Sequence, residues 1–256
     1  MTTDNQRVHY ERIHDRYQKH YYDRYSNYYR SKLYLNKLSR EFQGKKNILE
    51  VGCGGGSNLN TYLKHGMING DYLGIDISPS AVETFQLLSP DTEKYKSLVA
   101  DFTKEDLELS GEFDLILFVG VLHHMTNNLD QVFCNIERLL SNNGTVIFLE
   151  PNAHFLDAVR RIWYKFSDDF DHSNERALTS SEIESLATQH NLELKRGWYS
   201  GNIGYFVILQ SMIVRTPQWL KFILYKPLTI FDLFIEAIQS RFHLAALIRV
   251  YQKAET

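Results

Sequence analysis

The chain has 256 residues, an apolar fraction of 43% and a net charge of −3. This length suits one domain with insertions around a full hydrophobic core, and a slightly acidic chain has no overall basic field of the kind that binds nucleic acid. The N-terminus is polar, and charged residues and Pro227 interrupt the apolar region 219–238, so neither a signal segment nor a membrane-spanning helix is expected. Cys53 and Cys134 lack metal-ligand spacing; we expect reduced thiols in core elements of a cytoplasmic protein.

A glycine-rich turn follows the first predicted strand. The apolar run 48–51 contains Glu50, and Gly52, Gly54 and Gly56 follow at alternating positions. Glycine accepts positive φ and has no Cβ, so the backbone N–H groups of such a turn and the start of the next helix can lie against a ligand. A dinucleotide fingerprint G-x-G-x-x-G does not fit, because its last position falls on Ser57. A turn that binds no ligand is the structural alternative.

Acidic residues end the next two predicted strands. Asp76 closes the strand 72–76, and Ser78-Pro79 then predicts a helix N-cap and first helical position. Asp101 ends the third strand, 98–102. An acid at the tip of the second strand of a doubly wound sheet can accept two hydrogen bonds from a ribose diol, whereas the structural alternative for each acid is a helix cap.

Further strands alternate with helices along the rest of the chain. A fourth strand, 113–120, precedes His123-His124; a helix over 130–140 and a turn over 141–144 lead to a fifth strand, 144–151. Thr179 and Glu182 form a predicted capping box at the start of the next helix. This alternation predicts an α/β fold with a doubly wound parallel sheet covered by helices on both faces.

The E-x-G-x-G-x-G turn and the ordered strand ends resemble the class I S-adenosylmethionine (SAM)-dependent methyltransferases, specifically the type 11/12-like bacterial small-molecule enzymes. The resemblance is close over residues 45–152 and looser over 179–200. It implies a Rossmann-like sheet of seven strands, with strands 192–200 and 245–253 forming a final antiparallel hairpin. It also implies SAM as cofactor, S-adenosylhomocysteine as product and no metal.

The resemblance further implies the residues that contact the cofactor. These are Glu50, Gly52, Cys53, Gly54, Gly56, Asp76, Ile77, Asp101, Phe102, Val119 and Gly120. In this family the first acid and the glycines face the methionine portion, and the second acid faces the ribose. The third acid and its neighbour face the adenine, and the end of the fourth strand lines the methyl channel.

Three histidines are candidate general bases: His123 and His124 after the fourth strand, and His154 after the fifth. A sulfonium donor is already activated, so the protein must mainly align the acceptor and exclude water. A sugar hydroxyl would benefit from a base, whereas a phenol, a carboxylate or a neutral amine needs little more. The alternative is that the histidine pair only shapes the pocket through hydrogen bonds. His172 is a weaker candidate, and the acidic segment 168–171 is better explained as a solvated loop than as a metal site.

Three segments surround the core of this single domain, 1–256. In the arm, 1–44, five tyrosines recur at spacings of 7, 4, 4 and 3, which predicts one helical face that forms either a lid or a packing helix: Tyr10, Tyr17, Tyr21, Tyr25 and Tyr28. The segment 152–178 is expected to lie over the acceptor site. The apolar helical insertion 201–243 would bind a second subunit or a membrane surface, or pack on the sheet, and the sequence favours packing or a homodimer.

We therefore expect methyl transfer to a small-molecule or glycan-type acceptor in small-molecule biosynthesis, at oxygen, with no nucleic-acid partner. The alternatives are N- or C-methyl transfer, other SAM chemistry, and a SAM-binding protein acting as a non-catalytic partner subunit.

Overall fold

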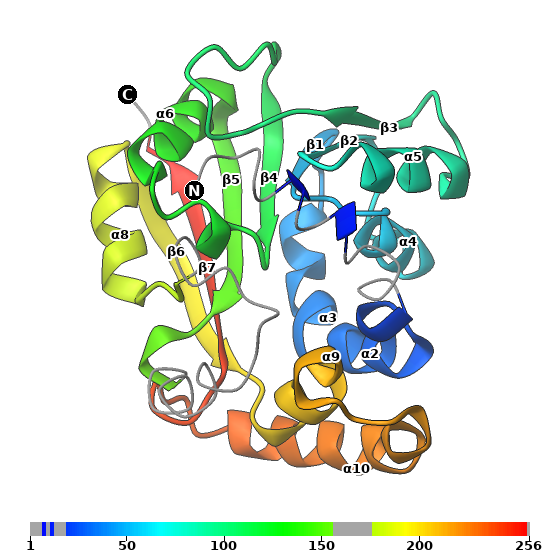
Figure 1. Ribbon diagram of the computed structural model, residues 1–256. Coiled ribbons are helices and arrows are strands. Elements are labelled where there is room, and N and C mark those ends of the chain that lie inside the picture. Colours follow the sequence, from blue (N-terminus) through cyan, green and yellow to red (C-terminus); the bar gives the residue numbers. More distant parts are fainter. Residues whose placement is uncertain (1–6, 9–10, 13–18, 156–175, 255–256) are drawn as a thin grey trace.

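A seven-stranded sheet forms the centre of the protein (Figure 1). The computed structural model describes residues 7–8, 11–12, 19–155 and 176–254. The strands are β1 (Asn47–Val51), β2 (Asp71–Asp76), β3 (Tyr95–Val99), β4 (Phe113–Val119), β5 (Leu140–Pro151), β6 (Leu192–Ser200) and β7 (Ala246–Lys253). They are ordered β3-β2-β1-β4-β5-β7-β6, with β7 antiparallel to both of its neighbours. The predicted fold class and the final antiparallel hairpin are confirmed.

The strands alternate apolar side chains between the two faces of the sheet. In β4, Leu115 and Leu117 enter one hydrophobic cluster, and Ile116 and Phe118 enter the other. Successive side chains of a strand point to opposite faces of the sheet. A strand that is apolar at every position is therefore a central strand covered on both faces. The carboxyl ends of these central strands are therefore held rigidly.

Helices cover both faces. The first cluster includes residues of η1 (Ser31–Leu35), α3 (Asn36–Leu38), η2 (Ser39–Phe42), α4 (Ser57–Lys64) and α5 (Pro79–Leu88). The second includes residues of η3 (Leu122–His124), α6 (Leu129–Leu139) and α8 (Ser180–Gln189). The predicted caps of α5 and α8 are present: Ser78 accepts from the Ala81 N–H, and Thr179 with Glu182 forms the capping box.

The start of β5 differs from the predicted turn. Phe113 pairs with Leu140 but Leu115 pairs with Thr145, so residues between these pairs bulge out of the ladder. Asn143 has φ 59° within this bulge. Asn tolerates the left-handed region better than other non-glycine residues, which allows the strand to begin at Leu140 rather than at Gly144.

The N-terminal arm does not form the single helix that the tyrosine spacing predicts. Asp23 is extended, with ψ 164°, and its carboxylate caps a new helix, α2 (Arg24–Arg30), by accepting from the N–H groups of Tyr25 and Ser26. Tyr21 therefore lies before the helix that carries Tyr25 and Tyr28, and the expectation of one shared helical face is wrong for these residues. Tyr10 and Tyr17 lie outside the described residues.

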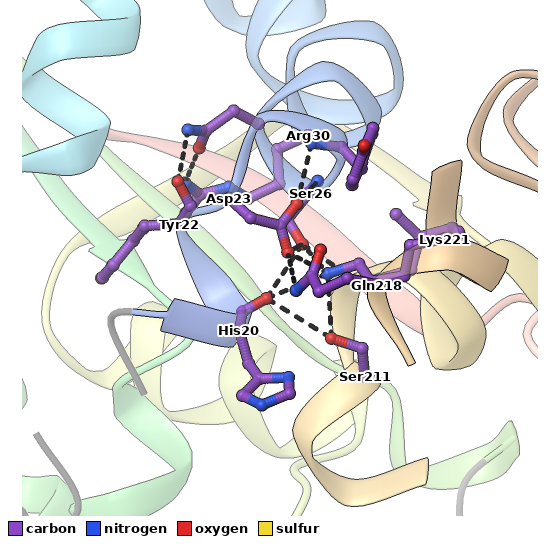
Figure 2. Close-up of polar contacts among 11 residues, drawn as sticks. His20, Tyr22, Asp23, Ser26, Arg30, Ser211, Gln218 and Lys221 are labelled. Carbon is purple, nitrogen blue, oxygen red and sulfur yellow. Dashed lines mark hydrogen bonds and ion pairs between the residues drawn. The ribbon is translucent and has the colours of Figure 1, made fainter. Parts of the chain in front are cut away.

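The segment between β6 and β7 is helical and packs on the arm. It contains η4 (Tyr205–Leu209), α9 (Ser211–Val214) and α10 (Gln218–Glu236), and α10 contacts α2, η1, η4 and β6. Figure 2 shows the junction: Lys221 of α10 is completely buried and pairs with Asp23, while its Nζ also donates to Ser26 Oγ at 2.8 Å and Ser211 Oγ at 2.9 Å. No helix in the described part of the chain is long and apolar enough to cross a membrane.

Candidate active site

A buried acid, Glu50, lies beneath the turn that follows β1. Glu50 is inaccessible to solvent and accepts hydrogen bonds from Asn58 Nδ2 at 2.6 Å and from the Tyr72 hydroxyl. Burial raises the pKa of the Glu50 carboxyl to about 8, with the Asn58 hydrogen bond and the Arg30 charge opposing the shift. Glu50 thus lies beneath the turn and connects β1 to α4 and β2.

All three glycines of the turn have positive φ: 71° at Gly52, 52° at Gly54 and 80° at Gly56. A Cβ on Gly52 would lie 2.5 Å from the Val121 side chain, and one on Gly56 would lie 2.8 Å from Phe85. A Cβ on Gly54 would lie 3.1 Å from the Tyr22 hydroxyl of the arm. The turn is therefore crowded from three directions, and the backbone conformation itself requires glycine.

Asp76 connects this turn to the next helix. Its Oδ2 accepts from the Gly54 N–H at 2.9 Å, and its Oδ1 accepts from the Ser78 N–H at 3.0 Å. The side chain is only half-buried. These contacts hold the carboxylate at the carboxyl end of β2, where an acid of a doubly wound sheet can accept hydrogen bonds from a ribose diol.

Asp101 carries an unsatisfied buried oxygen. Its Oδ1 accepts from the N–H and the hydroxyl of Thr103, at 3.0 and 2.6 Å, but its Oδ2 is buried and has no hydrogen-bond partner. Buried polar atoms are rarely left unpaired, because each loses its hydration without compensation. A donor from a ligand would satisfy this atom.

The carboxyl ends of β4 and β5 are joined through Glu150. Glu150 is inaccessible to solvent, and its Oε1 accepts from the N–H groups of Val121 at 3.0 Å and Leu122 at 2.9 Å. Its Oε2 lies 2.7 Å from His123 Nδ1. This acid therefore fixes both the backbone of the turn after β4 and the imidazole of His123.

The candidate histidines separate into a pair and a distant member. The rings of His123 and His124 lie with centroids 3.8 Å apart, and both side chains are half-buried. His154 instead packs edge-on against the Phe242 ring, with centroids 6.1 Å apart. His172 and the acidic segment 168–171 lie outside the described residues. Within the part of the chain that is described, no group of three potential ligands could hold a metal ion.

The arm contributes a buried arginine above the glycine turn. Arg30 is 4% exposed and donates to Asn58 Oδ1 at 3.0 Å and Ser57 Oγ at 3.1 Å. Its guanidinium lies over the Tyr22 ring at 4.9 Å, and its Nε is buried without a hydrogen-bond partner. A positive charge with an unsatisfied donor thus faces the start of α4, where a carboxylate ligand would be stabilised.

Neutral tyrosines lie near Glu150. Gln210 Nε2 donates to the Tyr205 hydroxyl at 3.2 Å, and Gln210 also hydrogen bonds to Tyr21. Burial raises the pKa of both phenols, and the nearby Glu150 charge raises them further. Tyr21 and Tyr205 are therefore protonated at neutral pH and able to donate hydrogen bonds.

The other predicted cofactor residues have two kinds of environment. Phe102 is 1% exposed and packs edge-on against Phe118, so its side chain belongs to the core. Cys53 is also buried, and burial raises its pKa, so only its backbone is available to a ligand. Cys134 is exposed on α6, so the expectation that both cysteines lie in the core is wrong for this one.

The methyl-channel segment is more open. Ile77 and Val119 are half-buried. A Cβ built on Gly120, whose φ is 69°, would meet no atom within 4 Å. The space beside Gly120 is therefore open at the end of β4, where the resemblance predicts the methyl channel.

The residues present fit SAM. The unsatisfied Asp101 Oδ2 suits the adenine amino group, Asp76 suits the ribose diol, and the unsatisfied Arg30 Nε suits the methionine carboxylate. Asp76 ends β2, but β3 ends at Val99 rather than at the predicted residue 102, so Asp101 lies two residues beyond it. The glycine turn and these acids lie at the carboxyl edge of a sheet with the strand order of a Rossmann-like methyltransferase fold.

Comparison with known proteins agrees with this class. Residues 49–146 match the family described as "Methyltransferase domain". The ubiquinone biosynthesis O-methyltransferase of Hydrogenovibrio crunogenus is 26% identical over 168 residues, which cover 62% of this chain and 67% of that protein. Its counterpart from Rickettsia typhi is 27% identical over 169 residues, which cover 64% of this chain and 65% of that one. The chain thus aligns with only about two thirds of the length of these relatives.

Solved structures share the fold at low sequence identity. The mycolic acid cyclopropane synthase CmaA1, complexed with SAH and CTAB, has a TM-score of 0.67 and 16% identity, covering 98% of both chains. A SAM-dependent methyltransferase from Archaeoglobus fulgidus has a TM-score of 0.60 and 11% identity, covering 93% of this chain and 98% of that one. Residues 49–146 therefore match a methyltransferase domain, and the chain has the fold of the class I SAM-dependent methyltransferases.

Sequence reasoning missed several residues of this site. Glu150 could have been found by the rule that identified Asp76 and Asp101, because it too is an acid at the carboxyl end of a strand. Arg30, Tyr22 and Tyr205 carry no such signal, since only the tertiary fold brings them to the strand ends.

Proposed function

We propose that the enzyme transfers the methyl group of SAM to an oxygen of a small-molecule or glycan-type acceptor, with His123 as the general base. The contact between His123 Nδ1 and Glu150 Oε2, at 2.7 Å, carries this proposal. A carboxylate that accepts from Nδ1–H selects the tautomer with an unprotonated Nε2, which can take a proton from a hydroxyl. The names of the relatives, which are O-methyltransferases, support oxygen as the acceptor atom.

When bound, SAM supplies an electrophilic methyl group on a sulfonium. Transfer of that methyl group to the acceptor oxygen would leave S-adenosylhomocysteine, and His123 Nε2 would take the hydroxyl proton of the acceptor. Glu150 stabilises the resulting imidazolium and keeps the ring oriented. The products are the methylated acceptor and S-adenosylhomocysteine, and His123 then returns its proton to solvent.

Tyr21 and Tyr205 suit a polar acceptor. Both are protonated phenols beside Glu150, so they can donate hydrogen bonds that orient an acceptor but do not compete with His123 as bases. His124, whose ring lies beside that of His123, is assigned to the wall of the same pocket. His154, which packs against Phe242, is not part of this proposal. Free cysteines suit the reducing cytoplasm, where we expect the enzyme to work.

The proposal is tested with methyl-labelled SAM and a panel of phenolic, sugar-hydroxyl, carboxylate and amine acceptors. Mass spectrometry of the labelled product identifies the acceptor atom, and a product methylated only at nitrogen or carbon would contradict the oxygen assignment. His123→Asn should lower kcat about 100-fold or more while leaving the Kd for SAM unchanged. The pH dependence of kcat/KM that arises from the base should also disappear in this variant.

The chain offers a matched control. His190 follows the end of α8, and its Nδ1 lies 3.1 Å from a carboxylate oxygen of Glu137 in α6. These two residues form another His–Glu pair outside the site. His190→Asn should keep both kcat and the pH profile. Full activity of His123→Asn would assign His123 to shaping the turn after β4.

A further inference from the structure

Helix α10 has its polar and apolar faces the opposite way round from an ordinary surface helix. Its buried residues are polar: Lys221, Thr229, Asp232 and Glu236. Apart from Lys226, its large exposed residues are apolar: Trp219, Phe222, Ile223, Ile230, Phe231, Leu233 and Phe234. A surface helix normally buries its apolar stripe against the core and turns its charges to water. The reversed arrangement is explained if a second apolar or amphiphilic surface covers the outer face of α10.

Buried polar contacts on the inward face fix the rotation of the helix. Lys221 Nζ pairs with Asp23 and donates to the His20 carbonyl oxygen at 3.0 Å (Figure 2). Asp232 accepts from the Tyr29 hydroxyl and from the Asn202 N–H at 2.8 Å. Glu236 pairs with Lys37 of α3. Rotating α10 to bury its apolar stripe would break these buried pairs, so the outward face is the stable one.

The exposed side chains form one stripe along the helix. Trp219, Phe222, Ile223, Ile230, Leu233 and Phe234 recur at helical spacing and therefore share one face. Phe234 is 74%, Ile230 66% and Trp219 65% exposed. Figure 1 shows α10 along the lower edge of the molecule, with α2 above it. An apolar stripe of this kind, with Lys226 near its midpoint, marks an interaction surface.

The charges around the stripe are positive. Between residues 203 and 243 the acids are Asp232 and Glu236, and both are buried against the protein. Arg215 before the helix, Lys226 on it and Arg241 after it are all exposed. The surface that α10 presents is thus apolar, aromatic and basic, which is the composition of a helix that lies flat in the head-group region of an anionic membrane.

A second copy of the chain fits this face less well. Lys226 lies close to the midpoint of α10, so an antiparallel two-fold pairing of the stripes would place Lys226 opposite its own copy. The face carries no acid to compensate these two charges. Lipid phosphates can compensate a lysine whose stem lies along the apolar surface.

We propose that the outer face of α10 binds the surface of a membrane containing anionic lipids, with Trp219, Ile230 and Phe234 entering the interface. The helix lies on the bilayer and does not cross it. Because η4 and α10 belong to one insertion, this contact would hold Tyr205 and the acceptor side of the site near the lipid surface.

The test is flotation of the full-length protein with vesicles of phosphatidylcholine alone or mixed with phosphatidylglycerol. The wild type should bind the mixed vesicles, and bind them less at high salt. Trp219→Ser with Phe234→Ser should lower the partition coefficient about tenfold or more. Lys226→Gln with Arg241→Gln should weaken binding to the mixed vesicles and remove most of its salt dependence.

Leu87→Ser with Leu88→Ser is the matched control, because it removes two exposed leucines from α5 at a different surface. It should bind vesicles as the wild type does, and melting curves should show that every variant is folded. Failure of the wild type to bind mixed vesicles would overturn the proposal, as would equal binding by the Trp219/Phe234 variant. A wild-type dimer that becomes monomeric in that variant, without vesicle binding, would assign the face to a second copy instead.

Discussion

The proposed cofactor half and the proposed acceptor half of the site are built in different ways. The glycine turn and the acids proposed for the ribose and the adenine come from one continuous stretch, 50–103, and neighbouring segments hold them: Asp76 accepts from the Gly54 N–H, and Asp101 accepts from Thr103. The acceptor half is assembled from the arm, the turn after β4, the end of β5 and η4. Local chemistry determines the first half, whereas long-range packing determines the second.

The largest expected effect concerns the acid beneath the cofactor half. Burial raises the pKa of Glu50 from 4.5 to about 8, so the folded state keeps a proton that the unfolded state has released. The stabilisation is complete below pH 4.5 and is lost as the pH rises toward 8. The free energy of unfolding should therefore fall by up to about 4 kcal/mol between pH 5 and 8, since one pKa unit corresponds to about 1.4 kcal/mol.

Glu50→Gln cannot ionise, so urea unfolding of this variant should lack that fall with pH. Glu137→Gln is the control: hydrogen bonding by Asn191 lowers the pKa of Glu137, so its contribution changes below this pH window. Equal pH slopes for the wild type and Glu50→Gln would show that Glu50 is ionised in the folded protein.

The next effect tests whether the acceptor half depends on the junction between the arm and α10. Lys221→Met leaves Asp23 without its buried partner, and we expect a loss of about 3 kcal/mol in unfolding free energy. Lys226→Met, on the exposed face of the same helix, should change it by about 0.5 kcal/mol or less. Hydrogen exchange should rise in α2 and α10 of Lys221→Met but not in β1 and β2. An equal rise of hydrogen exchange in α2, α10, β1 and β2 would show that the two halves of the site do not differ in their dependence on this junction.

A pair of glycines compares the turn after β1 with the turn after β4. Gly52 and Gly120 both have positive φ, but a Cβ clashes with Val121 at Gly52 and meets open space at Gly120. Gly52→Ala should cost about 2 kcal/mol or more and Gly120→Ala about 1 kcal/mol, measured by urea unfolding. Equal costs would mean that Val121 moves freely and that the turn after β1 is not crowded.

The contrast between the halves also explains what the sequence could predict. The succession of strands along the chain and the ends of β2, β5 and β6 follow from apolar runs closed by turn residues. The predicted cofactor residues follow from the glycine spacing, the acids after the strands and the family resemblance. The break in the arm was missed because tyrosine spacing reports a periodicity, while the Asp23 cap that ends it depends on the Lys221 contact across the fold. The rotation of α10 was equally unpredictable. Its apolar residues suggest burial, and only the partners of Lys221, Asp232 and Glu236 determine which face points inward.

The smallest expected effect concerns the adenine end of the cofactor half. Asp101→Asn keeps an oxygen for Thr103 but replaces the unsatisfied Oδ2 with an NH2 group, which would meet the adenine amino group donor to donor. The Kd for SAM should rise about tenfold, or about 1.4 kcal/mol, in isothermal titration calorimetry. The melting temperature without ligand should stay about the same, because one unpaired buried polar group replaces another. Thr103→Ala, which touches only Oδ1, should change the Kd about threefold or less. Wild-type affinity in Asp101→Asn would mean that a water or another donor satisfies Oδ2, and that the adenine is held by packing alone.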